Sequence, residues 1–131
     1  MNDISFLSAK QLTSLIRRRK LSSLELLDHY IDRIERYNPS LNAIITKDFD
    51  QARDSARIAD GDIANGVMRG PLHGLPMTVK ESFDVAGLPT TWGVPDQRGY
   101  KAKTDAVSVQ RLRQAGAIII GKSNVPIWLA D

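Results

Sequence analysis

The stretch DAVSVQRLRQAGAIIIGKSN, residues 105–124, indicates a helix that leads directly into a buried strand. Its first half carries apolar residues at helical spacing, namely Val109, Leu112 and Ala115. Gly116 is expected to close this helix, because glycine readily adopts the left-handed conformation found at helix ends. The apolar run at residues 117–120 is typical of a strand buried on both faces, as in a parallel sheet.

Residues 116–123, GAIIIGKS, match the nucleotide-binding pattern G-x-x-x-x-G-K-[ST], but their composition argues against such a loop. A phosphate-binding loop needs a flexible, glycine-rich turn whose backbone N–H groups are free. Between Gly116 and Gly121 stand one alanine and three isoleucines, whose N–H groups we expect to be engaged in a sheet. We therefore predict a strand that ends at Gly121, and no phosphate bound by Lys122.

A second strand is predicted in the segment LPMTVKES, residues 75–82, which follows a glycine-rich loop. Apolar and polar side chains alternate along it, with Met77 and Val79 against Thr78, Lys80 and Ser82. The order strand, helix, strand in the second half of the chain indicates α/β architecture. We expect N-terminal helices followed by a mixed, largely parallel sheet core.

The first half of the chain predicts helices. The segments SAKQLTSLIRRRK and SSLELLDHYIDRIERYNP each begin with a capping box, formed by Ser8 with Gln11 and by Ser22 with Glu25. The apolar stripe of the second helix is predicted to be Leu24, Leu27, Ile31, Ile34 and Tyr37. Pro39 is expected to stop this helix, because proline lacks the N–H that a helix needs.

A short strand is predicted at LNAIIT, followed by a third helix in DFDQARDSARIADG. Its small-residue face consists of Ala52, Ala56 and Ala59, and Gly61 is expected to end it. We accordingly expect one domain, or part of one, in which residues 1–65 are mainly helical and residues 66–131 begin the α/β core.

The 131 residues carry a formal net charge of +3 and contain no cysteine. This composition excludes disulfides, thiolate zinc sites and cysteine nucleophiles from this stretch of sequence. The basic residues form no long stripe, so we expect no nucleic-acid partner. No apolar segment approaches bilayer length, and the N-terminus lacks the pattern of a secretory signal. We therefore expect a cytoplasmic protein with no membrane partner.

Few side chains stand out as candidates for catalysis. His29 and His73 have no spaced carboxylate or second ligand nearby, so we expect solvated or loop-packing roles for both. Lys80 is unusual because it lies in a strand, where burial would favour the neutral amine that serves as a general base. The alternative is that Lys80 ends the strand and reaches water. Strand alternation directs Glu81 to the opposite face.

Two long segments resemble consecutive blocks of one enzyme family. Residues 70–93, GPLHGLPMTVKESFDVAGLPTTWG, resemble the block around the catalytic lysine of the amidase signature family, G-x-L-x-G-[IL]-P-x-x-x-K-[DE] followed by G-x-x-T-T-x-G. Residues 104–128, TDAVSVQRLRQAGAIIIGKSNVPIW, are similar to the next block, in which a helix leads to a strand ending G-K-[ST]-N. The segment SSLELLDHYIDRIERYNPSLNAIIT also resembles the family's N-terminal region, so the likeness covers nearly the whole chain.

The resemblance implies hydrolysis of carboxylic amide C–N bonds by a serine, a second serine on a cis peptide and a lysine. Lys80 falls on the lysine, which in this mechanism accepts a proton from the bridging serine. The implied partner is a small-molecule amide substrate, and no metal or organic cofactor is implied. The resemblance implies that the segment just past SNVP approaches the substrate pocket, as it does in some relatives, which makes Leu129 or Ala130 a candidate substrate contact.

One departure from the family is large, because its Gly/Ser-rich segment with both serines lies downstream of the matching region. We expect these residues to be a truncated, N-terminal part of a single amidase domain that is inactive alone. Ser82 falls on neither serine of the motif, so a Lys80–Ser82 pair would lack a recognisable oxyanion hole. Exposed edges would favour self-association, with a homo-oligomer as one outcome. The alternatives are an amide-transferring subunit that acts on aminoacyl-tRNA, and a truncated non-catalytic interaction module.

Overall fold

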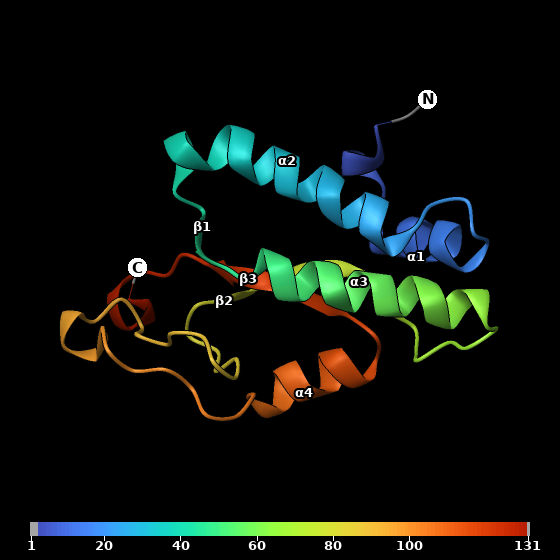
Figure 1. Cartoon of the computed structure of the whole chain (residues 1–131). Helices are drawn as coiled ribbons and strands as arrows, with labels where there is room; N and C mark the ends of the chain where they lie inside the picture. The colour runs from blue at the N-terminus through green and yellow to red at the C-terminus, as the bar shows by residue number, and fades with distance from the viewer. Residues whose placement is uncertain (1–2, 131) are drawn as a thin grey trace.

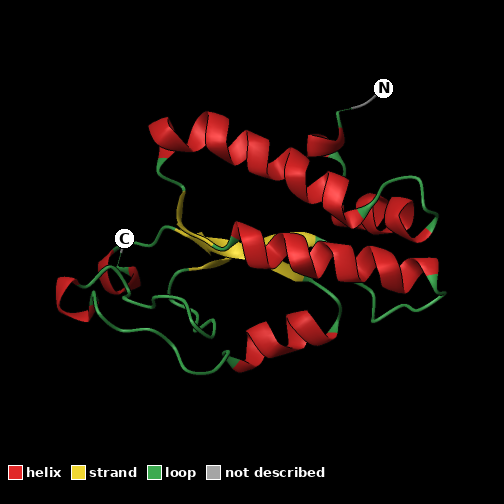
Figure 2. Cartoon of the chain, viewed as in Figure 1, coloured by secondary structure: helices red, strands yellow, loops and turns green. Residues whose placement is uncertain are grey.

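The computed structural model describes residues 3–130 (Figures 1 and 2). The helices of this part of the chain are α1 (Ala9–Arg17), α2 (Ser23–Leu41), α3 (Phe49–Ala64) and α4 (Val107–Gln114). The strands are β1 (Ile44–Lys47), β2 (Pro76–Lys80) and β3 (Ile118–Ser123). Single 3-10 turns form at Ile4–Phe6, Pro95–Gln97 and Ile127–Leu129. Within residues 3–130, no helix is long and apolar enough to cross a bilayer.

The sheet is mixed, with β3 between its two neighbours in the order β1-β3-β2. β2 runs parallel to β3, and β1 runs antiparallel to it. The unit β2–α4–β3 is therefore a parallel strand–helix–strand crossover, and the predicted α/β class is confirmed. The central place of β3 explains its apolar sequence, because helices cover both of its faces: α2 and α3 lie on one side of the sheet and α4 on the other (Figure 1).

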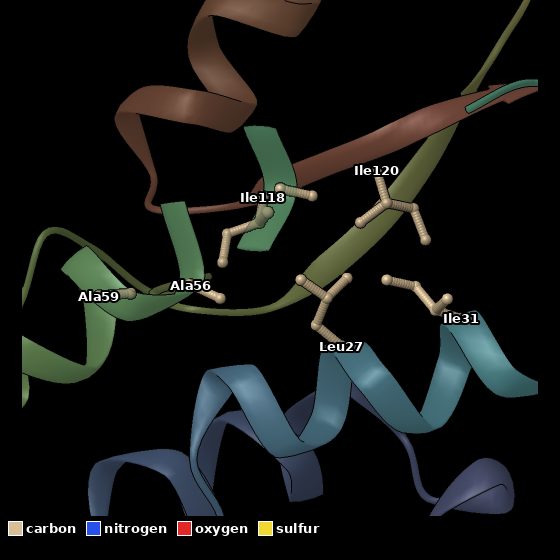
Figure 3. Close-up of a cluster of buried hydrophobic side chains, with 7 residues drawn as sticks. Leu27, Ile31, Ala56, Ala59, Ile118 and Ile120 are labelled. Atoms are coloured by element: carbon tan, nitrogen blue, oxygen red, sulfur yellow. The ribbon is translucent and has the colours of Figure 1, made fainter. Parts of the chain in front are cut away.

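The main apolar core lies between β3 and the helices α2 and α3 (Figure 3). Leu27 and Ile31 of α2 reach towards Ile118 and Ile120 of β3. The predicted alanine face of α3 is confirmed, since Ala52, Ala56 and Ala59 are all buried in this cluster. Small side chains there let α3 lie close to the strand.

A second core joins α1 to α2. Both capping boxes are present, with Ser8 accepting a bond from the Gln11 N–H at 3.3 Å and Ser22 one from the Glu25 N–H at 3.0 Å. Leu26, outside the predicted stripe of α2, is fully buried with residues from three other segments, namely Leu12 and Ile16 of α1, Ile63 of α3, and Leu75 just before β2. The second helix therefore buries two faces, and Tyr37 at the end of its predicted stripe is exposed.

The prediction that Pro39 stops the second helix is wrong. The helix continues to Leu41 and is capped by Asn42 in the left-handed conformation, with φ of 49°. The Asn38 side chain stabilises this end, because it bonds both the N–H and the carbonyl of Ile44, each at 2.8 Å. Pro39 therefore stands inside the helix, in its last turn, where it lacks the N–H that would bond the carbonyl four residues earlier.

The predicted end of the third helix at Gly61 is also wrong. The helix runs on to Ala64, because Ile63 is buried in the second core and tertiary packing holds one more turn. The left-handed glycine that follows the helix is Gly66, with φ of 76°.

Candidate functional site

Lys80 is the last residue of β2, and its side chain is exposed in this part of the chain. Val79 before it is buried, as strand alternation requires. No side chain or carbonyl in residues 3–130 forms an ion pair or hydrogen bond with the Lys80 amine. Ser82 lies in the turn after the strand, so the predicted shared strand face of Lys80 and Ser82 is wrong. Lys80 is thus an available amine at the carboxyl end of a strand.

Glu81 follows Lys80 and is buried, with 2% of its surface exposed. Its carboxylate accepts hydrogen bonds from the backbone N–H groups of Thr91 and Trp92, the latter at 2.9 Å. Its own N–H donates to the Ser123 carbonyl at 2.9 Å and so extends the pairing of β2 with β3. Glu81 therefore points away from Lys80 and binds the loop that contains the TTWG motif.

Lys122 is fully buried, which the sequence interpretation did not anticipate. The cause is a bulge: Met77 pairs with Ile119, but Thr78 pairs with Gly121, so Ile120 is an extra residue on β3. Lys122 then stands beside Val79 on the face covered by α4. The prediction that β3 ends at Gly121 is wrong, since the strand continues to Ser123.

The Lys122 ammonium donates hydrogen bonds to the Pro89 carbonyl and to Thr90 Oγ1, the second at 2.8 Å. Burial lowers the pKa of Lys122, and the negative charges of Glu81 and Asp84 oppose this shift. The strand interpretation of the GAIIIGKS motif is confirmed, because residues 118–123 form β3. The lysine of the motif holds a loop of its own chain, and no phosphate cradle is formed.

The two histidines contact other residues of the fold. His73 is buried, accepts a bond from the Arg69 N–H at Nδ1 and donates from Nε2 to the Ala59 carbonyl at 2.9 Å. His29 contacts the Ser5 hydroxyl at 2.7 Å on the outside of α2. Among the described residues, no three His, Asp or Glu side chains gather as metal ligands would.

The candidate substrate contacts lie on the segment that returns to the TTWG loop. The Trp128 N–H donates to the Trp92 carbonyl at 2.9 Å, and the two indole rings lie 6.4 Å apart. Leu129 is half-buried and Ala130 exposed. A cleft of about 260 Å³ separates this segment from the loop, lined by Trp92, Tyr100 and Trp128 among others. Neither Lys80 nor the candidate contacts Leu129 and Ala130 are among the residues that line this cleft.

A larger apolar cleft of about 430 Å³ lies between α2 and the sheet. It is lined by Tyr37 and Leu41 of α2, Met77 and Thr78 of β2, and Ile120 of β3, among others. Lys80 is not one of the lining residues, although it follows Thr78 on the same strand.

The comparisons with known proteins agree with this arrangement. The family model named Amidase matches residues 25–131. The chain belongs to the amidase signature family. Over 119 residues it is 40% identical to an indoleacetamide hydrolase of Bradyrhizobium diazoefficiens, and this match covers 91% of the chain and 23% of that amidase. It is 36% identical to a glutamyl-tRNA(Gln) amidotransferase subunit of Acidothermus cellulolyticus, and that match covers 95% of the chain and 25% of the relative.

The fold agrees with that of a solved amidase. The native peptide amidase of Stenotrophomonas maltophilia superimposes with a TM-score of 0.86 and 32% identity, covering 95% of this chain and 26% of that enzyme. The chain thus spans about a quarter of the length of the amidases it matches. Within the matched region, sequence reasoning missed the pair of buried charges, Glu81 and Lys122. The sequence did contain a signal for these two residues, because each is a charged residue close to the end of a predicted strand.

Proposed function

We propose that this chain takes part in hydrolysis of carboxylic amides and supplies Lys80 as the general base. The observation that carries the proposal is the position of Lys80. It ends β2 within a chain of the amidase family, and its amine has no partner in residues 3–130. An uncommitted amine at the end of a sheet strand is free to exchange a proton with a group placed beside it.

In the proposed reaction, the neutral Lys80 amine accepts a proton from a serine hydroxyl supplied from outside residues 1–131. That serine in turn accepts the proton of the nucleophilic serine, whose oxygen attacks the amide carbonyl carbon. Backbone N–H groups near the nucleophile stabilise the negative oxygen that forms. The C–N bond then breaks, the amine leaves with a proton, and water hydrolyses the acyl-enzyme. Residues 1–131 would form the N-terminal part of this single catalytic domain.

Leu129 and Ala130 are proposed as contacts to the substrate. They follow the segment in which Trp128 bonds the TTWG loop, so the loop and this segment would approach an amide together. The relatives' names suggest which amides to try, since they include an indoleacetamide hydrolase and a fatty-acid amide hydrolase.

Amide transfer is the second candidate function. It is favoured by the 36% identity to an amidotransferase subunit whose name specifies glutamyl-tRNA(Gln). Both functions begin with the same attack on an amide carbon, and they differ in whether the released ammonia leaves as a product or is passed to a second acyl group. Release of ammonia from free amides without any tRNA or partner protein would favour hydrolysis.

Substitution of Lys80 in the full-length protein tests the proposal. We expect Lys80→Ala to lower kcat by roughly 10²–10⁴-fold, the usual contribution of a general base. Lys80→Arg should be equally poor, because a guanidinium does not give up its proton at working pH. Ammonia release from indoleacetamide, a fatty-acid amide and an aryl amide is the measurement, with the exposed Lys103→Ala as matched control. Near-normal turnover by Lys80→Arg would contradict the role as base.

Residues 1–131 alone are expected not to hydrolyse amides. A base without a positioned nucleophile and oxyanion donors lacks the main contributions to acyl transfer. The measurement is turnover of an aryl amide by highly purified chain, with Lys80→Ala as a control for contaminating hydrolases. Lys80-dependent turnover by the 131-residue chain would contradict this expectation and would make Ser82 the first nucleophile to test.

A further inference from the structure

Two buried charges of opposite sign stand at the ends of neighbouring strands. Glu81 is 2% exposed and Lys122 0% exposed, and they are the buried carboxylate and the buried ammonium of residues 3–130. They do not form a direct salt bridge within 4.0 Å. Each side chain instead binds the same short loop segment, residues 89–92.

The loop segment presents hydrogen-bond donors to the negative charge and hydrogen-bond acceptors to the positive charge. Two backbone N–H groups, of Thr91 and Trp92, donate to the Glu81 carboxylate. Two oxygens, the Pro89 carbonyl and the Thr90 hydroxyl, accept from the Lys122 ammonium. Such charge-assisted bonds are shorter and stronger than neutral ones. They hold Trp92 in a conformation with φ of 55°, which a non-glycine residue seldom adopts without support.

The same contacts fix the end of β2. Val79 stands beside Lys122, and Lys80 beside Ser123, in the register of the parallel pair. The Glu81 N–H continues this pairing by donating to the Ser123 carbonyl. Hydrogen bonds therefore join the loop to the ends of β2 and β3. Lys80 is one of the residues in this hydrogen-bonded unit, and its side chain is exposed.

We infer that Glu81 and Lys122 are positioning residues that clamp residues 89–92 and thereby fix the direction of Lys80. The inference rests on the proposed role of Lys80 in amide hydrolysis. Burying a carboxylate and an ammonium gains little stability compared with an apolar pair of similar size. What such a network does supply is a single orientation of the chain, because each bond is directional.

The clamp is tested by amide hydrogen exchange and steady-state kinetics on the full-length protein. Glu81→Gln removes one charge and keeps the shape of the side chain. We expect exchange at Thr91 and Trp92 to accelerate by about ten-fold or more. We expect kcat on an aryl amide to fall on the order of 10²-fold, since small misplacements of a catalytic group have effects of this size. KM should change much less. Glu35→Gln, at an exposed acid of α2, is the matched control and should change neither quantity.

A milder pair of variants covers the case in which a buried charge change prevents folding. Thr90→Val removes only the hydroxyl that Lys122 binds, and Thr90→Ser keeps it. The clamp predicts faster exchange at the amides of Thr91 and Trp92 and lower kcat for Thr90→Val, with both restored in Thr90→Ser. Unchanged exchange and unchanged kcat in folded Glu81→Gln and Thr90→Val would overturn the inference.

Lys80→Ala, measured in parallel, separates the two proposals. If Lys80→Ala is inactive while Glu81→Gln and Thr90→Val keep full kcat, the positioning role falls and the base role stands. If Lys80→Ala keeps its turnover, the base role falls and the positioning role, which depends on it, falls as well. Accelerated exchange together with lost kcat in Glu81→Gln and Thr90→Val, in a protein that needs Lys80, supports both.

Discussion

The two faces of the sheet are built in different ways. The face towards α2 and α3 is covered by long helices and holds a purely apolar cluster around Leu27 and Ile31 (Figure 3). The opposite face has the short helix α4 and a long stretch of loop between β2 and α4 (Figure 2). It combines a smaller apolar cluster around Val109 with the buried charges of Glu81 and Lys122.

These two kinds of contact have different consequences. Apolar burial is non-directional and roughly proportional to area, so it stabilises the helical face without specifying the orientation of any one group. Hydrogen bonds from buried charges are directional, and on the other face they join the TTWG loop to the ends of β2 and β3, next to Lys80 in the chain. We conclude that the helical face supplies stability and the loop face supplies geometry.

Leu27→Ala should disturb the helical face most. Leu27 is fully buried, and its truncation leaves a cavity between α2 and β3. We expect a loss of about 2–5 kcal/mol in the free energy of unfolding. Chemical denaturation of the full-length protein measures it, with Ile58→Ala, at an exposed position of α3, as the control. A loss below that of the control would mean that this face does not carry the stability.

Gly116→Ala tests the turn from α4 into β3, where the Gly116 backbone lies close to His73. Gly116 has φ of 94°, and a Cβ there would stand 2.6 Å from His73 Cα. We expect destabilisation by about 1–3 kcal/mol from the strained backbone, with the clash adding to it. Gly61→Ala is the matched variant, because Gly61 lies in α3 with no atom within 4 Å of an added Cβ. It should stabilise by about 0.5–1 kcal/mol. Equal effects at the two glycines would contradict the comparison.

Asp62→Asn probes a charge on the outside of the helical layer and should have the smallest effect. The hydrogen bond from Arg69 holds the pKa of Asp62 below its ordinary value of 3.8. A carboxylate with a lowered pKa stabilises the fold above its unfolded-state pKa, and this contribution is lost as pH falls through the folded-state pKa. Asp62→Asn should therefore be slightly less stable than the parent protein at neutral pH. In denaturation curves the difference should begin to shrink near pH 3.8 and vanish below the lowered folded-state pKa. A difference that grows on acidification would contradict this sign.

Local signals in the sequence predicted the helical layer well. The capping boxes at Ser8 and Ser22 depend on residues three apart, so they are readable without knowledge of the fold. The predictions at Pro39 and Gly61 failed because side chains distant in sequence or in the next element extend each helix. Asn38 binds the start of β1, and Ile63 packs in the second core.

The loop face and the strand end at Lys80 were predictable only in part. The position of Lys80 followed from the strand pattern and from the family motif. The burial of Lys122 did not follow, because it depends on the one-residue bulge between β2 and β3. A shift of one residue moves a side chain to the other face of a strand, and alternation alone does not reveal it. The partners of Glu81 lie ten and eleven residues further along the chain, in a loop without periodicity.

The division of roles between the two faces can be tested in one paired measurement. Ile31→Val on the helical face and Glu81→Gln on the loop face are compared in the full-length protein for the free energy of unfolding and for kcat per folded molecule. We predict that Ile31→Val loses about 0.5–1.5 kcal/mol and keeps its kcat. Glu81→Gln is predicted to lose kcat on the order of 10²-fold while it remains folded. If kcat fell in Ile31→Val and was unchanged in Glu81→Gln, the division of roles would be contradicted.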